Sequence, residues 1–147
     1  FANRLTPAVR SLVSQAVDTY AGDFLAGDLY SDSIRDERQH LMQRYIGVLF
    51  RLALLYLSVG DNLQALESLK RLLDKDPICE PAVRLLMIAS ALLGSRNRIP
   101  QICDDLSRRL EESYGLEPDE LTIALKDRLL AGEKPGPGMW KNEVIVS

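Results

Sequence analysis

The sequence predicts an all-α protein built from antiparallel helix pairs, and three observations support this prediction. Apolar residues recur at three- and four-residue spacing through most of the chain, which is the period of helices that bury one face. Gly60, Gly94 and Gly115 follow such stretches where helices commonly end. The 147 residues, 46% of them hydrophobic and 27% charged, are enough to form one core.

The first half of the chain divides into two helices and a loop, followed by a third helix. Thr6-Pro7 supplies an N-cap and a first helical residue, so we expect a helix over about 7–20, and a compact loop with two glycines and two aspartates over 21–28. A long helix is predicted over 33–59, and Gly60 ends it. Asp61 and Gln64 form a capping pattern that starts the next helix, over about 62–75.

The second half continues with three helices and a tail. Pro81 suits the first turn of a helix that runs to Gly94, and Pro100 delays the next helix to about Arg98, from where it runs to Tyr114. A last helix is predicted over about 120–131. Two Pro-Gly pairs follow Gly132, so the domain is expected over 1–132 and a tail over 133–147. Docking of Trp140 or 144–146 on the body is one alternative and strand pairing with a partner is another, but we expect a mobile terminus.

An internal repeat groups these helices into pairs. An offset of 34 residues superposes Leu49 on Val83, Leu52 on Leu86, Gly60 on Gly94 and Leu69 on Cys103. A 34-residue period made of paired helices is typical of tetratricopeptide repeats. Tyr56, Gly60 and Ala65 fit the aromatic, turn and small positions of that repeat, whereas the second unit lacks the aromatic, the small residue and the closing proline. We therefore expect a tetratricopeptide-like right-handed superhelix of antiparallel helix pairs.

Stacked helix pairs form a concave face that suits peptides or other domains. The first helix of each pair lines this face. The predicted partner-binding residues are those at its inner positions: Gly47, Phe50, Leu54, Ser58, Arg84, Ile88 and Ala91. Phe50 and Leu54 fit the core equally well.

No residue is predicted to be catalytic, to bind a cofactor or to ligate a metal. His40, the single histidine, stands in a helix among arginines and glutamines, without a paired acid. Cys79 and Cys103 lack a close second ligand, and Cys103 takes an apolar position of the repeat, so it is expected to be a buried small hydrophobe. Phosphate loops, nucleophile elbows and dinucleotide fingerprints are absent from the sequence.

The net charge indicates which partners this segment can bind, and the cysteine content indicates the cellular compartment. A net charge of -3 opposes direct nucleic-acid binding by this segment, because duplex affinity comes largely from clustered Lys and Arg. The apolar region 45–60 is interrupted by Arg51 and is too short for a membrane span. Two cysteines suit a reducing cytoplasm. The chain opens without methionine, so we expect it to be a fragment of a longer protein.

Four motifs resemble one family in their order and spacing. They are Tyr-Ala-Gly-Asp-Phe-Leu-Ala-Gly over 20–27, Glu-Arg at 37–38, the stretch from Gly-Asp to Asp-Pro over 60–77, and Tyr-Gly-Leu-Glu-Pro over 114–118. Over about residues 6–131 the chain resembles the bacterial transcriptional activator domain of SARP-type antibiotic-pathway regulators. Asp119 stands where a capping Ser is usual, and Pro100 within the second repeat also departs from the pattern.

This resemblance implies an all-helical, tetratricopeptide-like domain that follows a winged helix-turn-helix DNA-binding domain. Such a domain helps dimerisation, packs on the DNA-binding part or relays signals. The expected function is therefore a non-enzymatic regulatory and protein-interaction domain of a bacterial transcriptional regulator. Its expected partners are its own DNA-binding domain, a second protomer or another regulatory protein. The repeat alone would equally suit a general adaptor without a transcriptional role, and an enzyme is the least favoured class.

Overall fold

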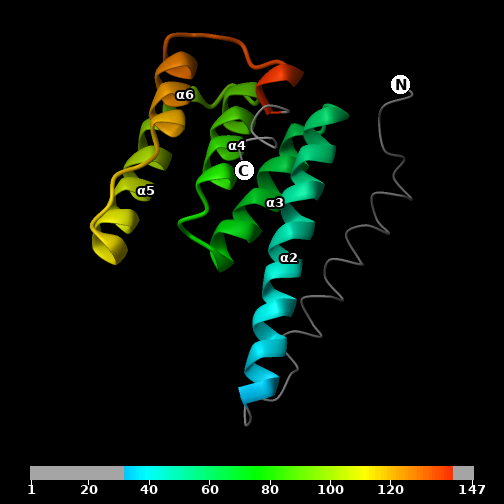
Figure 1. Cartoon of the computed structure of the whole chain (residues 1–147). Helices are drawn as coiled ribbons and strands as arrows, with labels where there is room; N and C mark the ends of the chain where they lie inside the picture. Colours follow the sequence, from blue (N-terminus) through cyan, green and yellow to red (C-terminus); the bar gives the residue numbers. More distant parts are fainter. Residues whose placement is uncertain (1–31, 141–147) are drawn as a thin grey trace.

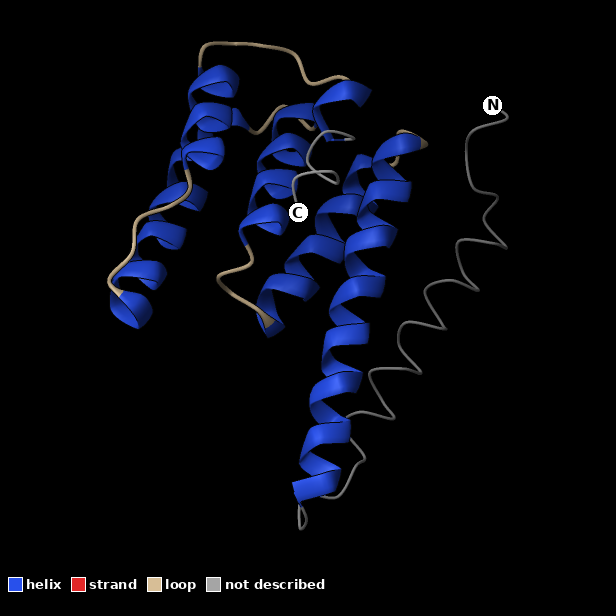
Figure 2. Ribbon diagram, in the orientation of Figure 1, coloured by secondary structure: helices blue, strands red, loops and turns tan. Residues whose placement is uncertain are grey.

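The computed structural model describes residues 32–140, and all regular structure within that range is helical (Figures 1 and 2). The elements are α2 (Asp32–Ser58), α3 (Asn62–Lys75), α4 (Glu80–Leu92), the short 3-10 helix η1 (Arg96–Arg98), α5 (Ile99–Tyr114) and α6 (Glu120–Leu130). A further helical turn occupies 137–140. The helix predicted over 7–20, the loop predicted over 21–28 and residues 144–146 lie outside the described residues.

The predicted bounds of α2 to α6 are confirmed to within two residues at every helix end. Local chemistry explains this agreement. The side chain of Asp61 accepts a hydrogen bond from the backbone N of Gln64 at 3.4 Å, and that of Asp119 accepts one from the backbone N of Leu121 at 2.9 Å. Pro81 and Pro100 both lie in the first turn of their helices, where no backbone donor is needed.

The two helix pairs turn with the same geometry 34 residues apart. Gly60 and Gly94 have φ of 81° and 80°, a left-handed conformation that costs other residues energy. After each glycine the chain closes the same bond: Asp61 N donates to Tyr56 O at 2.8 Å, and Ser95 N donates to Ser90 O at 2.8 Å. The repeat seen in the sequence therefore corresponds to a repeated turn in the structure.

Helix α4 lies at the centre of the described part of the chain. Successive helices run antiparallel (Figure 1), and α4 contacts α2, α3, η1, α5 and α6. Ten consecutive residues, 82–91, are buried, as expected for a helix that packs against several others. Every other described helix therefore contacts α4, although α2 packs mainly against α3.

The seam between α2 and α3 contains Tyr56 and Ala65, the residues assigned to the aromatic and small positions of the repeat. Ala65 and Leu69 of α3 are completely buried, and Tyr56 of α2 is almost so. The small side chain of Ala65 lets the two helices approach each other, while the larger side chains fill the space on either side. Cys103, the counterpart of Leu69 in the second pair, is buried too.

One described segment, Arg35–Ser58, is long and apolar enough to cross a bilayer by length and composition alone. In the structure its apolar residues pack on α3 and α4. Core helices of globular proteins meet the same criteria, so the segment gives only weak support for a membrane span.

The expectation of a mobile terminus is wrong for residues 137–140. Trp140 is 5% exposed and belongs to the main core cluster, and Met139 packs against that cluster. After α6 the chain crosses the top of the bundle and ends its described part in this turn (Figure 1). The backbone N of Met139 donates to the backbone O of Gly136 at 2.9 Å, which closes a turn around the second Pro-Gly pair, 137–138. Burial of a large aromatic side chain thus orders a segment whose composition favours disorder.

Candidate functional site

The structure does not bring the seven predicted partner-binding residues onto one open face. Arg84, Ile88 and Ala91 of α4 are buried. Phe50 and Leu54 of α2 are half-buried and pack against the core cluster, Gly47 is half-buried, and Ser58 is exposed. A partner could therefore reach the α4 members only if the elements that cover them moved, and the partner-binding role of all seven stays a prediction.

Helix α6 covers part of this face through a chain of polar side chains. Arg84 donates from Nη1 to Oγ1 of Thr122 at 3.1 Å, and Thr122 donates from Oγ1 to Oε1 of Glu80 at 2.9 Å. The same carboxylate oxygen accepts from the backbone N of Asp119 at 2.8 Å, at the start of α6. Because a buried guanidinium is costly without polar partners, these bonds favour one position of α6 on α4.

The other end of α6 is held as well. Arg96 of η1 donates from Nη1 to the backbone O of Leu129 at 2.6 Å, which satisfies a carbonyl in the last turn of the helix. Arg128 and Glu133 form an ion pair just beyond. Sequence reasoning named Arg84 but missed Glu80 and Thr122. The spacing of Glu80 and Arg84, one helical turn apart in an otherwise apolar helix, was the available signal.

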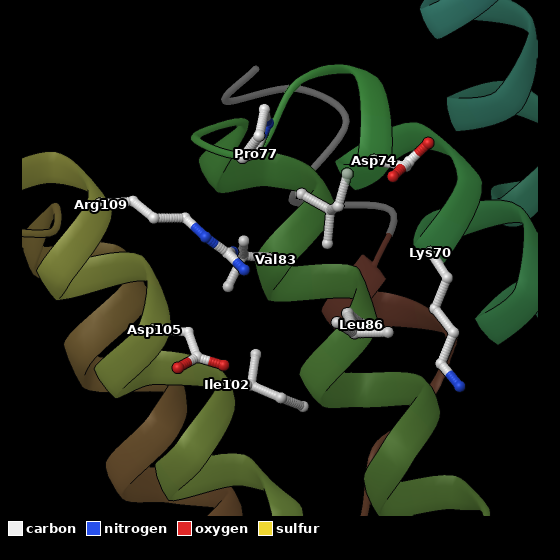
Figure 3. Close-up of a pocket in the computed structure, with 9 residues that line it drawn as sticks. Lys70, Asp74, Pro77, Val83, Leu86, Ile102, Asp105 and Arg109 are labelled. Carbon is white, nitrogen blue, oxygen red and sulfur yellow. The ribbon is translucent and has the colours of Figure 1, made fainter. Parts of the chain in front are cut away.

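Another side of α4 borders a hollow that lies between α3 and α5 in the described part of the chain. There the three helices enclose a hollow of about 370 Å³ (Figure 3). Val83 and Leu86 of α4 form its floor, and Leu73 of α3 and Ile102 of α5 form its apolar walls. Figure 3 shows Arg109 reaching from α5 toward Val83, and Asp105 and Ile102 pointing from the same helix toward the space.

A smaller hollow of about 110 Å³ extends this space along α4. The two share Lys70, Leu86 and Ile102, and the smaller one reaches Leu93 and Arg98. Together they follow α4 from Val83 to Leu93, about 15 Å at 1.5 Å per residue. We call this feature the α4 groove; the residues lining it are Leu66, Lys70, Leu73, Asp74, Pro77, Val83, Leu86, Ser90, Leu93, Ser95, Arg98, Ile102, Asp105 and Arg109.

The rim of the α4 groove carries more unpaired positive than negative charge. Lys70 stands on the α3 side, and Arg98 and Arg109 stand on the α5 side. Of the two rim acids, Asp105 pairs with Arg108 at 3.3 Å and accepts from Nε2 of Gln101 at 2.9 Å. The pair of Asp105 and Arg108 lies within α5, three residues apart.

The titratable groups of the described residues do not form a reactive cluster. Within 32–140 there is no group of three His, Cys, Asp or Glu side chains that could hold a metal ion. Burial raises the pKa of both the Cys79 and Cys103 thiols, which lowers the fraction of reactive thiolate. The α4 groove is one of the hollows at the surface of the described residues, and it is lined partly by apolar side chains.

Comparison with known proteins identifies one family. The sequence model described as the bacterial transcriptional activator domain matches residues 2–130. No curated protein and no solved structure matches the chain.

Proposed function

Because this chain belongs to the bacterial transcriptional activator domain family, we propose that it is the regulatory and protein-interaction part of a bacterial transcriptional regulator. The family match over residues 2–130 is the observation that carries the proposal. The family is a regulatory one and not a known enzyme family. The proposed mode of action is therefore binding to other protein domains, without catalysis.

The physical character of the described residues supports this role. Helix α4, in which residues 82–91 are buried, gives a rigid centre on which surfaces of neighbouring helices are held. The α4 groove places apolar side chains at the surface between charged rims, as at many protein-recognition grooves. The net charge of -3 is unfavourable for contact with a nucleic-acid backbone.

In the proposed regulator, DNA is contacted by a winged helix-turn-helix domain and this chain transmits the regulatory contact. Its partners are that DNA-binding domain, a second protomer or another regulatory protein in the cytoplasm. We further propose that the pairs α2–α3 and α4–α5 stack as a tetratricopeptide-like right-handed superhelix. The matching turns at Gly60 and Gly94 support this arrangement. Of the predicted inner-face residues, Ser58 is exposed, and Gly47, Phe50 and Leu54 are half-buried.

Chromatin immunoprecipitation and transcript measurement with the full-length regulator test the proposal. The protein is expressed intact and with residues 2–130 deleted. We expect the intact protein to be enriched at discrete promoters and to raise transcription from them. The deleted protein should keep measurable promoter binding but lose activation, because the DNA contacts lie elsewhere.

Unchanged activation after the deletion would contradict the regulatory role. Failure of the intact protein to associate with any promoter would contradict the transcriptional role. The alternative, a general adaptor without transcriptional duty, is suggested by the repeated turns and the open groove. It would be favoured by stable protein partners together with no enrichment on DNA.

A further inference from the structure

We propose that the α4 groove binds an amphipathic helix of a partner protein, with its apolar stripe in the groove and acidic side chains on both flanks. This inference rests on the proposed function in one respect, namely that the domain acts by contact with other proteins. It adds the place of the contact and the chemistry of the partner.

The form of the α4 groove favours a helix over a small molecule. Small-molecule sites place several polar groups around a mostly apolar pocket. Here the floor is formed by Val83 and Leu86, and the charged residues stand at the rim. The buried side-chain atoms that lack a hydrogen-bond partner among the described residues, such as Tyr56 Oη, belong to residues outside the groove lining.

The neighbouring elements also favour a helix over an extended peptide. An extended peptide is commonly bound by adding a strand to the edge of a sheet, and residues 32–140 contain no strand. Two helices, α3 and α5, flank the groove along α4 and provide the apolar walls Leu73 and Ile102. A helix presents apolar side chains at i, i+3, i+4 and i+7, and the 15 Å length of the groove, at about 1.5 Å per residue, matches nearly three turns of such a stripe.

One end of the groove already exposes apolar surface. Leu93, which follows α4, is 40% exposed although it lines the smaller hollow. Toward the other end Val83 is buried, so the exposed apolar surface of the groove lies mainly at the Leu93 end. A partner helix would therefore bury Leu93 at one end and cover Leu86 and Ile102 in the middle. Burial of this apolar surface would contribute favourably to the free energy of binding.

The positive charges at the rim of the groove favour a partner helix that carries acidic side chains on its flanks. Lys70 on α3, Arg98 at the end of η1 and Arg109 on α5 have no ion-pair partner among the described residues. Arg98 and Arg109 are 11 residues apart in sequence, so they mark opposite ends of the α5 side. Of the two acids, Asp105 is engaged by Arg108 and Gln101, which leaves Asp74 as the single unengaged acid of the lining. A helix with glutamates on both flanks would meet a cation on each side.

Peptide binding to the full 147-residue chain tests this inference. The probes are two fluorescent synthetic peptides about three heptads long with leucine at a and d. One carries glutamate at e and g, and the other carries lysine there. Fluorescence anisotropy measures both affinities. We expect the glutamate peptide to bind the parent chain at least about tenfold more tightly than the lysine peptide, with the difference shrinking as salt is raised.

A charge-reversal variant makes the test specific to the groove. Lys70→Glu combined with Arg109→Glu should invert the preference, so that the lysine peptide becomes the tighter ligand. The matched control combines Lys75→Glu with Lys134→Glu, which changes the net charge equally at exposed residues that do not line the groove. The control should keep the parent's preference. Circular dichroism of both variants checks that the helices are retained.

Three results would overturn the inference. They are no measurable binding of the glutamate peptide, a parent chain that prefers the lysine peptide, and equal inversion by the control, which would indicate net charge rather than the groove. None of these bears on promoter association or activation by the full-length regulator. Conversely, a regulator that never associates with DNA would remove the transcriptional role and leave the peptide result standing.

Discussion

Replacing Trp140 tests whether the final described turn is part of the core. Its indole is 5% exposed, and a buried tryptophan removes about 150–250 Å² from water. At about 25 cal/mol per Å² this burial contributes about 4–6 kcal/mol to docking of the turn. The indole Nε1 is buried without a hydrogen-bond partner among the described residues, which costs about 1–3 kcal/mol. Trp140→Ala should therefore lower the free energy of unfolding by about 3 kcal/mol.

Urea denaturation followed by circular dichroism measures this loss, because the variant has no tryptophan to report by fluorescence. Trp140→Phe is the matched control. It keeps an aromatic ring and removes the unpaired N–H, so we expect stability within about 1.5 kcal/mol of the parent. The phenylalanine variant should thus keep most of the free energy of unfolding that the alanine variant loses.

The parent chain carries its own spectroscopic check, since Trp140 is its single tryptophan. A docked indole should emit at shorter wavelength than free tryptophan and resist quenching by acrylamide. Emission like that of the unfolded chain, or an alanine variant as stable as the parent, would refute the reasoning. Either result would mean that residues 137–140 do not contribute to the core.

Four further outcomes are expected. Leu69→Asp buries an unpaired carboxylate at a completely buried position and should abolish cooperative unfolding by circular dichroism; a variant that melts like the parent would refute the seam. Gly94→Ala should cost about 1–2 kcal/mol in urea denaturation, because φ is 80° although the added methyl has open space; no loss would argue against a left-handed turn. Thr122→Val should cost about 2 kcal/mol by removing the hydroxyl between α4 and α6, and Thr122→Ser should restore stability if the bridge matters. Burial raises the pKa of the Cys79 and Cys103 thiols above 9.0, so the folded state holds more protons than the unfolded state at alkaline pH. The free energy of unfolding should therefore fall as the pH rises through 9.0 and beyond, and it should fall less in a variant with alanine at both positions. Parallel plots of stability against pH for the two proteins would contradict this.

The helices were predictable because their signals are local. A cap such as Asp61 acts within three residues, and a turn glycine such as Gly60 acts on the residues beside it. The 34-residue repeat assigned Leu69 to an apolar position without knowledge of its neighbours, and the structure buries it completely. The family resemblance could also be read from motifs along the chain, and the family match confirms it.

The surfaces were less predictable. Periodicity predicted an open inner face that included Arg84 and Ile88, and the structure buries both. Nothing near these residues in sequence indicates that Thr122, 38 residues away, supplies a hydrogen bond to Arg84. The Pro-Gly content predicted a mobile end, yet Trp140 joins the core because its apolar area outweighs the local preference of the turn.

By itself, the amino-acid sequence determined the helical class, the helix ends, the repeated turns and the family of this protein. The tertiary structure alone decided which face of α4 is covered by α6, that the final turn docks, and that an apolar groove stays open between α3 and α5. The physical reason is the sequence distance over which the interactions act. Hydrogen bonds of caps and turns join residues a few positions apart, whereas the choice of which apolar faces meet depends on burial summed over residues far apart in the chain.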